Sequence, residues 1–533
     1  MATLAKGAMA SSLPSWADVS WDMIPDPSVK PLPYLVTAFL AIVLVYSLQA
    51  SVFGVKNPIP LLNPRRPFEF TDTRAKKDFV FGSKKMLGDW FGANPDKPVR
   101  LISGFGEVTV LPPHLANELR NDNRLDFSKW TYKAFHAQIP GFDGFKEGTR
   151  DTNIVQAVIL KDLTKYLNKL TEPLAEETAF ALAELLPTGD DDKDNCTWHS
   201  IPLRETMLRL IARISSRVFL GEELCRDEAW LKVTREYTVD SFKAAEELRL
   251  WPAASRFIVH HFLASCRKIR THVREARRTI APVLARRREE KLRNPELAFN
   301  DALEWFEQAA KGEEYDPAIA QLVISLAAIH TTTDLVCQTL TELVRHPSII
   351  PALRAEITTA LRDGGWKKTS LYNMKLLDSV IKETQRVKPI SLVSMNRVAL
   401  STVELSDGTV IPRDSLLNVS MHKMWDPAVH ANPAAWDGYR FLRMRETPGR
   451  EHQAQLVSTG PDHLGFGHGQ HACPGRFFAA NEVKIALVQL LLKYDFRLPA
   501  GGPEPTARAF GFSYSTDPFA TMEYCGREPE VEV

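Results

Sequence analysis

The sequence predicts a mainly helical α+β protein, in which one large domain follows a single N-terminal transmembrane helix. Helical periodicity dominates the middle of the 533-residue chain. Short strand-like segments cluster late, including a hairpin whose Asp407-Gly408 turn separates residues 402–405 from residues 409–411. One long, uncharged apolar segment lies near the start of the chain. A hydrophobic content of 44% is enough for a large core around a cofactor.

The apolar N-terminal segment has the length of a membrane span. No charged residue occurs between Lys30 and Lys56, and residues 34–53 are almost wholly apolar. A bilayer is crossed by about 20 such residues. A cleaved signal peptide is the alternative, but its apolar run takes roughly 7–15 residues and begins earlier in the chain. We therefore expect residues 1–30 to be luminal and residues 31–55 to form the anchor.

The charges that flank this span predict its orientation. Lys6 and Lys30 precede the span, whereas a larger basic group follows it: Lys56, Arg65, Arg66, Arg74, Lys76 and Lys77. Basic flanks stay on the cytosolic side, so the bulk of the chain is expected to face the cytosol. The sequons at Asn195 and Asn418 would then remain unused.

Prolines follow the predicted anchor directly. Four of them fall in residues 56–70 and prevent a continuous helix: Pro58, Pro60, Pro64 and Pro67. We expect this range to be a short, semi-rigid neck. Residues 71–533 show no repeat and no low-complexity break, so they are expected to form one domain.

Charge and cysteine content exclude several classes of protein. The net charge is +1, from 66 basic and 65 acidic residues, so no global basic field exists for nucleic-acid binding. The six cysteines include no Cys-x-x-Cys pair, which argues against a disulfide framework or a structural zinc site. The cysteine pattern fits a reducing compartment better.

Four helices are predicted from the period of the apolar residues, and the last of them is unusually long. The predicted ranges are 172–186, 203–219, 266–293 and 317–346. Asp316 is a natural N-cap for the last helix, Pro317 suits its first position, and Pro347 stops it. Its length of about 45 Å is enough to cross the whole domain.

A glycine-rich loop with one cysteine lies near the C-terminus. Residues 465–476 read Gly-Phe-Gly-His-Gly-Gln-His-Ala-Cys-Pro-Gly-Arg, and an amphipathic helix is predicted after them. Pro474 at the first helical position would place Cys473 at the N-cap, where free amides and the helix dipole stabilise a thiolate. A thiolate is the form that binds iron. Gly467, Gly469 and Gly475 leave room for the backbone to approach a flat ring.

The residues alone leave three interpretations of this loop open. Cys473 is an iron ligand, or it is an inert buried cysteine in a glycine-rich turn. Alternatively it joins His463, His468 and His471 in a zinc site, since the four residues lie within eleven positions.

The pattern Phe466-x-x-Gly469-x-His471-x-Cys473-x-Gly475 resembles the haem-binding loop of the cytochrome P450 family. The resemblance implies haem b held by Cys473, and a fold whose helical bulk surrounds the haem beside a small β region. The family usually has an arginine at the position of His471, where it pairs with a haem propionate. A neutral imidazole can still donate a hydrogen bond. The histidine, with the continuation Pro-Gly-Arg-Phe-Phe-Ala, resembles enzymes of fungal secondary metabolism.

Two further patterns resemble structural and cofactor positions of the same family. Glu383 and Arg386 lie on a predicted helix over residues 371–387, and Arg440 follows at the spacing of the family's buried Glu-Arg-Arg network. The resemblance gives these three residues a structural role on the proximal haem side, because buried charges need such pairing. Arg397 resembles a second propionate-binding position.

The middle of the long helix resembles the family's oxygen groove, which reads Ala-Gly-x-acid-Thr-Thr. Residues 327–332 read Ala-Ala-Ile-His-Thr-Thr, so Ala328 replaces the glycine and His330 replaces the acid. The resemblance implies that Thr331 steers protons to oxygen at the haem, with the imidazole of His330 as part of the route. Consecutive threonines are poor choices inside a helix, as is expected of functional sites. The alternative is a polar patch that packs against another helix.

The resemblance implies a monooxygenase that uses O2 and an external NADPH-cytochrome P450 reductase at the endoplasmic reticulum membrane. No dinucleotide loop or flavin site occurs in the sequence. Four aromatic and aliphatic ranges are expected to line the substrate pocket, namely 130–145, 241–262, 390–395 and 510–515. They favour a large lipophilic substrate, a terpenoid or indole-terpenoid first, with an alkaloid or polyketide as the alternative, including oxidative coupling or ring formation. A non-catalytic haem- or zinc-binding protein is the alternative class.

Overall fold

The computed structural model describes residues 58–531 apart from 68, 70, 151 and 189–195, together with positions 33, 34, 36–38 and 41. The chain divides into two compact units, Met1–Pro58 and Ile59–Val533. The predicted anchor, residues 31–55, lies almost wholly outside the described residues. Within the described part, one helix, Pro317–Arg345, is long and apolar enough to cross a membrane, but 72% of its apolar window is buried, as in a core helix.

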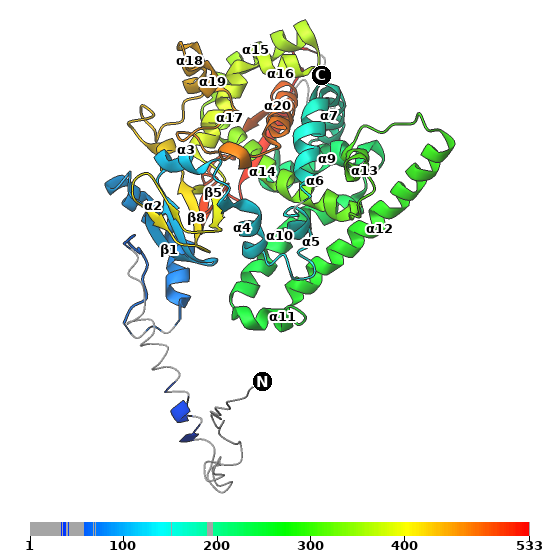
Figure 1. Cartoon of the computed structure of the whole chain (residues 1–533). Helices are drawn as coiled ribbons and strands as arrows, with labels where there is room; N and C mark the ends of the chain where they lie inside the picture. The colour runs from blue at the N-terminus through cyan, green and yellow to red at the C-terminus, as the bar shows by residue number, and fades with distance from the viewer. Residues whose placement is uncertain are drawn as a thin grey trace, which may run out of the picture. The chain divides into compact units, whose positions relative to one another are not determined.

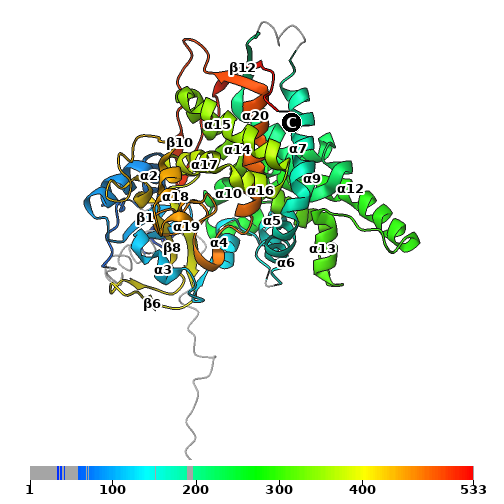
Figure 2. The same ribbon diagram turned by 90° about the horizontal axis from the view of Figure 1, so that it is seen from above.

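The larger unit is built around this helix, α14 (Pro317–Arg345), as Figure 1 shows. The side chain of Asp316 accepts hydrogen bonds from the backbone N–H groups of Ala318 and Ile319, which confirms the predicted N-cap. The helices that pack on α14 include α9 (Leu203–Leu224), α10 (Glu228–Arg249), α12 (Ala264–Arg293), α17 (Lys375–Val387) and α20 (Arg476–Lys493). In both views α14 and α20 lie side by side near the middle of the unit (Figure 2).

The predicted helices are present, and three of them have different bounds. The first is α7 (Thr164–Leu185), which begins earlier than expected and contains Pro173. The second is α9, which continues past residue 219 to Leu224, across a non-helical Gly221. The predicted helix 371–387 is two helices, α16 (Lys368–Asn373) and α17, because Met374 between them is not helical. The remaining α-helices are α2 (Thr73–Ala93), α3 (Ala116–Leu119), α4 (Phe127–Ala134), α5 (Asp143–Glu147), α6 (Ile154–Ala157), α11 (Arg256–Val259), α13 (Ala302–Ala310), α15 (Ile350–Gly364), α18 (Arg440–Glu446) and α19 (Glu451–Ala454).

A five-stranded sheet lies beside the helices, in the order β1-β2-β8-β5-β3. Its strands are β1 (Val99–Ser103), β2 (Gly106–Leu111), β3 (Leu125–Asp126), β5 (Val393–Ala399) and β8 (Leu416–Ser420). Three of them come from residues 99–126, so the prediction that strands cluster late was incomplete. The register between β5 and β8 shifts between Ser394 and Arg397, and this irregularity occurs where β5 presents Arg397.

The smaller sheets are two hairpins and one three-stranded sheet. The hairpin of β6 (Val403–Glu404) and β7 (Val410–Ile411) confirms the predicted turn, in which Gly408 has φ 82°. The second hairpin is β10 (Arg508–Phe510) with β11 (Ser513–Ser515). The third sheet has the order β4-β12-β9, from β4 (His199–Pro202), β12 (Thr521–Gly526) and β9 (Tyr494–Arg497).

The prediction against disulfides was wrong for one pair of cysteines. Cys196 and Cys525 form a disulfide across 329 residues of sequence. The two come together because β12 pairs with β4, just after Cys196. The spacing of cysteines in the sequence carries no sign of this pairing, since strand partners so distant leave no local pattern.

Candidate active site

A cavity with about 1230 Å³ of empty space lies between α14 and the loop that precedes α20. Thr331 and Thr332 of α14 line one side, and Phe466 and Cys473 of the loop line another. Most of the other lining residues are aliphatic or aromatic, which suits a flat apolar cofactor or a lipophilic ligand.

Cys473 reaches this cavity through a tight loop before α20. Its backbone N–H donates to the Phe466 carbonyl at 2.7 Å. The prediction that Cys473 is the N-cap was wrong, because Gly475 adopts a non-helical conformation (φ −88°, ψ 6°) and is itself the N-cap of α20. Burial raises the pKa of the Cys473 thiol, while the backbone N–H groups of Gly475 and Arg476 act in the opposite direction. The expected amides therefore still face the sulfur.

Gly469 is required for packing of the loop. Its φ is +78°, and a Cβ atom there would lie 2.4 Å from the backbone oxygen of Arg120. Gly467 also has a positive φ, but a Cβ atom there would meet nothing closer than 3.6 Å. Close approach to a ring was the predicted reason for the glycines, whereas Gly469 is needed for contact with the Arg120 segment.

Two buried hydrogen-bond donors without partners lie on α4 and β5, which pack against each other. Arg397 is 2% exposed, and its Nη1 donates to the Asn396 carbonyl at 2.7 Å. Among the described residues, neither Nη2 of Arg397 nor Nε1 of Trp130 has a hydrogen-bond partner. Burial lowers the pKa of Arg397 to about 10. Unpaired buried donors are costly, so these two groups fit the carboxylates of haem.

His471 lies close to the same donors. The ring of Phe127 is 5.9 Å from the Arg397 guanidinium and 6.0 Å from the His471 ring, so it joins the two. Burial, and then the positive charge of Arg397, lower the pKa of His471. The lowered pKa favours the neutral imidazole, and its hydrogen bond to a haem propionate stays a prediction. Trp130 was expected only as a residue of the substrate pocket. Its unpaired Nε1 could be recognised as a possible donor to haem only from its burial, which the sequence does not show.

The two residues predicted to pass protons point to different sides of α14. The Thr331 hydroxyl lines the cavity and donates to the carbonyls of Ala327 and Ala328, at 2.8 and 3.1 Å. His330 is absent from the described lining, and its Nε2 donates to the Arg235 carbonyl of α10 at 2.9 Å. Neighbouring helix residues project about 100° apart. The geometry therefore does not support a proton route through His330.

The sequence reasoning missed Glu482, a fully buried acid on α20. The Ser215 hydroxyl donates to its Oε1. Burial raises the pKa of Glu482 to about 8, although hydrogen bonds with Ser215 and Thr332 act against this increase. At neutral pH the side chain is therefore a neutral carboxylic acid next to Thr332. The sequence gives it little signal, because Asn481 and Lys484 beside it make this part of the helix look polar.

The structure brings the predicted Glu-Arg-Arg network together. Glu383 and Arg386 are 0% exposed, and two hydrogen bonds of 2.8 Å join them. Nε of Arg440 lies 3.1 and 3.0 Å from the two carboxylate oxygens of Glu383. The carboxylate thus has two cationic partners, which is what a buried charge requires.

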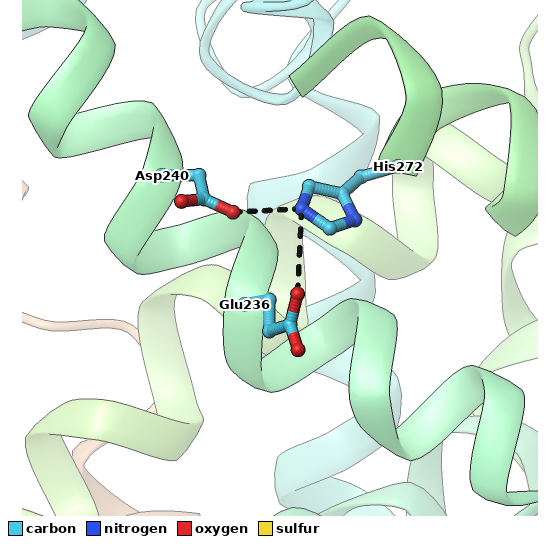
Figure 3. Close-up of side chains that lie close together, drawn as sticks. All are labelled: Glu236, Asp240 and His272. Atoms are coloured by element: carbon cyan, nitrogen blue, oxygen red, sulfur yellow. Dashed lines mark hydrogen bonds and ion pairs between the residues drawn. The ribbon is translucent and has the colours of Figure 1, made fainter. Parts of the chain in front are cut away.

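Among the described residues, the histidines near Cys473 do not form a group that could share a metal ion with it. His468 accepts from the Thr459 hydroxyl at 3.1 Å and donates to Asn117 Oδ1 at 3.0 Å. In the part of the chain that the structure describes, the side chains close enough to share a metal ion are instead Glu236, Asp240 and His272, on α10 and α12 (Figure 3).

This group already has a cation. Lys268 places its Nζ 2.8 Å from Asp240 and 3.3 Å from Glu236, and His272 Nε2 lies 2.8 Å from Asp240. The described histidines of the Cys473 loop form no such group, so the geometry does not support a zinc module built on them.

Comparison with known proteins gives the family. The family model described as Cytochrome P450 matches residues 108–521. A cytochrome P450 monooxygenase of Fusarium sporotrichioides is 46% identical over 466 residues, which are 87% of this chain and 84% of the relative. One of Aspergillus oryzae is 49% identical over 468 residues (86% and 84%), and one of Gibberella fujikuroi is 45% identical over 446 residues (83% and 100%).

Similarity at this level extends over most of the chain in each case, and it covers both walls of the cavity between α14 and the Cys473 loop. Members of this family bind haem b and receive electrons from a separate reductase. The chain therefore belongs to the cytochrome P450 family, as a monooxygenase similar to those of fungal secondary metabolism.

Proposed function

We propose that the enzyme inserts oxygen from O2 into a C–H bond of a large lipophilic intermediate of secondary metabolism, and that this intermediate is a terpenoid or indole-terpenoid. The supporting observation is the cavity lining, in which aliphatic and aromatic side chains surround Thr331 and Cys473. Of the four ranges expected to line the pocket, 390–395 contributes through Ile390, while the other three contribute no residue to the described lining. An alkaloid or polyketide remains the second candidate.

The residues of this chain have separate tasks in the proposed reaction. Cys473 would hold the haem iron, and Arg397, Trp130 and His471 would face the haem carboxylates. When bound, haem supplies the activation of dioxygen, which no amino-acid side chain performs. The protein excludes water with an apolar lining and orients the substrate.

Thr331 is the proposed proton donor in the cavity. Its hydroxyl both donates and accepts, and its present acceptors are carbonyls of its own helix. A rotation about χ1 would release it to hold a water molecule or a proton at Oγ1. Thr332, the next residue of α14, and the neutral carboxylic acid of Glu482 provide a second possible source of protons.

The proposed cellular setting follows from the N-terminal segment. Residues 31–55 would anchor the enzyme in the endoplasmic reticulum membrane by a single span, with the catalytic domain in the cytosol. An NADPH-cytochrome P450 reductase in the same membrane would deliver the electrons.

The direct test is oxidation of candidate substrates by microsomes that contain the enzyme and a reductase. A panel of terpenoid, indole-terpenoid, alkaloid and polyketide intermediates is incubated with NADPH, and products are identified by mass spectrometry. We expect an oxygenated terpenoid or indole-terpenoid. Oxidation of only an alkaloid or a polyketide would replace the proposed substrate class. Microsomes with the Cys473→Ser variant are the control.

A further inference from the structure

Charged side chains are rare in the cavity lining. In the described lining, the charged residues are Asp334 and Lys388. Asp334 belongs to α14 and lies three residues after Thr331, on a neighbouring position of the same helix face. Lys388 directly follows α17, as its C-cap. A charged pair thus stands close to the proposed reaction site, in surroundings that are otherwise apolar.

Asp334 has all the partners that a buried carboxylate needs. Its Oδ1 accepts from the backbone N–H and the hydroxyl of Thr516, at 2.9 and 3.1 Å. Its Oδ2 accepts from the Nζ of Lys388. Arg204 adds a second cation 3.7 Å from Oδ1. The carboxylate therefore requires nothing from a ligand.

Lys388 is less well satisfied. An ammonium group has three N–H donors, and Asp334 is its one hydrogen-bond acceptor among the described residues. The side chain is 2% exposed, so water does not readily supply the missing acceptors. Burial lowers the pKa of Lys388, against the effect of the Asp334 charge. Unmatched donors on a buried cation are costly, and an oxygen atom in the cavity would remove this cost.

The local charge also lacks a balancing anion. Arg204 and Lys388 are two cations, and Asp334 is the single carboxylate with which both interact. The nearby Cys337 thiol does not balance them, because burial raises its pKa to about 12 and keeps it neutral. One positive charge is therefore in excess in the cluster of Arg204, Asp334 and Lys388, in which the arginine is 26% exposed and the lysine lines the cavity. A carbonyl oxygen would match the free N–H groups of Lys388, but a carboxylate would match both the donors and the charge.

We propose that Lys388 binds a carboxylate group of the substrate, so that the enzyme acts on lipophilic carboxylic acids. Asp334 holds the Lys388 side chain in position and does not touch the substrate. The acid group would fix the orientation of the apolar skeleton, and thereby the C–H bond that is presented to Thr331 and the haem. This inference rests on the proposed function, to which it adds the functional group that is recognised.

The test compares a carboxylic acid with its ester on the purified, haem-loaded enzyme. The probes are abietic acid, a tricyclic diterpenoid acid, and methyl abietate, and the dissociation constants are measured by equilibrium dialysis. A charge-assisted hydrogen bond predicts that the acid binds roughly tenfold or more tightly than the ester. Acid and ester that bind equally, or an acid that does not bind, would overturn the proposal without any variant.

Three variants show whether Lys388 causes the preference. Lys388→Met should weaken binding of the acid roughly tenfold and leave binding of the ester unchanged. Asp334→Asn keeps a side-chain oxygen that can accept from Lys388 but removes the competing charge, so this variant should bind the acid at least as tightly as the wild type. Lys375→Met, at an exposed position at the start of α17, is the matched control and should change neither constant. Equal weakening of acid and ester in Lys388→Met would show that the ion pair is only structural.

Failure of this inference is distinguishable from failure of the proposed function. If the substrate panel gives an oxygenated terpenoid while acid and ester bind equally, the acid anchor is wrong and the monooxygenase assignment stands. If the acid is preferred but no terpenoid is oxidised, the site binds carboxylates and the proposed substrate class is wrong.

Discussion

Thr331 and Cys473 line the same cavity and have different chemical tasks. The thiol is suited to hold the iron, because it lies in a tight loop with backbone N–H groups directed at the sulfur. The hydroxyl of Thr331 is suited to handle protons, because Thr331 lines the same cavity and its present acceptors are carbonyls of its own helix. Glu482 and Arg397 lie outside the described cavity lining, and we propose that they influence protonation and cofactor binding from there.

Thr331→Ala should uncouple electron use from product formation. Removal of the hydroxyl leaves Cys473 and the haem contacts intact, so haem content should not change. Positioned proton transfer contributes up to about 10²–10⁴-fold in rate, and Thr332 can replace part of it. We expect less product per NADPH and more hydrogen peroxide, measured together with saturating reductase.

Thr333→Ala is the matched control for this experiment. Thr333 also donates to a carbonyl of its own helix, that of Ile329 at 2.7 Å, but it is buried and lies outside the described cavity lining. Its product yield per NADPH should equal that of the wild type. An unchanged yield in Thr331→Ala would make Thr331 an ordinary helix residue.

Arg397→Leu should weaken the retention of haem. The variant removes a buried guanidinium whose Nη2 has no partner among the described protein groups. Loss of a charge-assisted hydrogen bond to a propionate predicts roughly tenfold or more faster haem loss. The measurement is the rate of haem transfer to excess apomyoglobin. Arg413→Leu, at an exposed position, should behave as the wild type, and an equal rate in Arg397→Leu would disprove the contact.

At the scale of elements, local sequence signals predicted the presence of a helix more reliably than the residues at which it begins and ends. Asp316, Pro317 and Pro347 mark the bounds of α14 because capping and proline geometry act within one turn. The break at Met374 and the N-cap at Gly475 were missed. At both places the backbone leaves the helical region although no residue in the sequence demands it. Packing against neighbouring elements decides such positions.

Glu482 joins three helices, and its titration should be visible in stability. Burial raises its pKa from 4.5 to about 8 in the folded state. Between these values the folded protein holds the extra proton, so the free energy of unfolding falls as pH rises, by at most about 1.4 kcal/mol per pH unit. Glu482→Gln stays neutral. The stability of the variant relative to the wild type should therefore increase from pH 6 to pH 8.

The measurement for Glu482→Gln is the thermal unfolding midpoint of the haem-loaded enzyme at several pH values. Glu446→Gln, at an exposed position, is the control and should parallel the wild type throughout. A constant difference between Glu482→Gln and the wild type would mean that Glu482 does not change its protonation in this range.

At the scale of the whole molecule, the family and the cofactor loop were predictable, whereas distant pairings were not. Cys473 lies in one short sequence pattern, and Glu383 and Arg386 lie three residues apart in another. The disulfide of Cys196 with Cys525 depends on strand pairing across 329 residues. Lys388 and Asp334 likewise meet only because α14 and α17 pack together. Such contacts form only in the tertiary structure, so no local pattern of residues in the sequence predicts them.

Deletion of residues 1–55 should release the enzyme from membranes. The deleted segment contains the predicted span, and the unit that begins at Ile59 keeps its own core. We expect the truncated protein in the supernatant after ultracentrifugation, with its haem bound, while the full-length chain sediments. If the truncated protein sedimented to the same extent, a second membrane contact would be required.

The central claim is that Cys473 holds haem iron as a thiolate. The most direct measurement is the absorption spectrum of the reduced enzyme with carbon monoxide, because a strongly red-shifted Soret band reports thiolate ligation. We expect this band in the wild type and in Cys225→Ser, which replaces a free buried cysteine outside the described cavity lining. We expect the band to be lost in Cys473→Ser, and a band that persists in that variant would contradict thiolate ligation by Cys473.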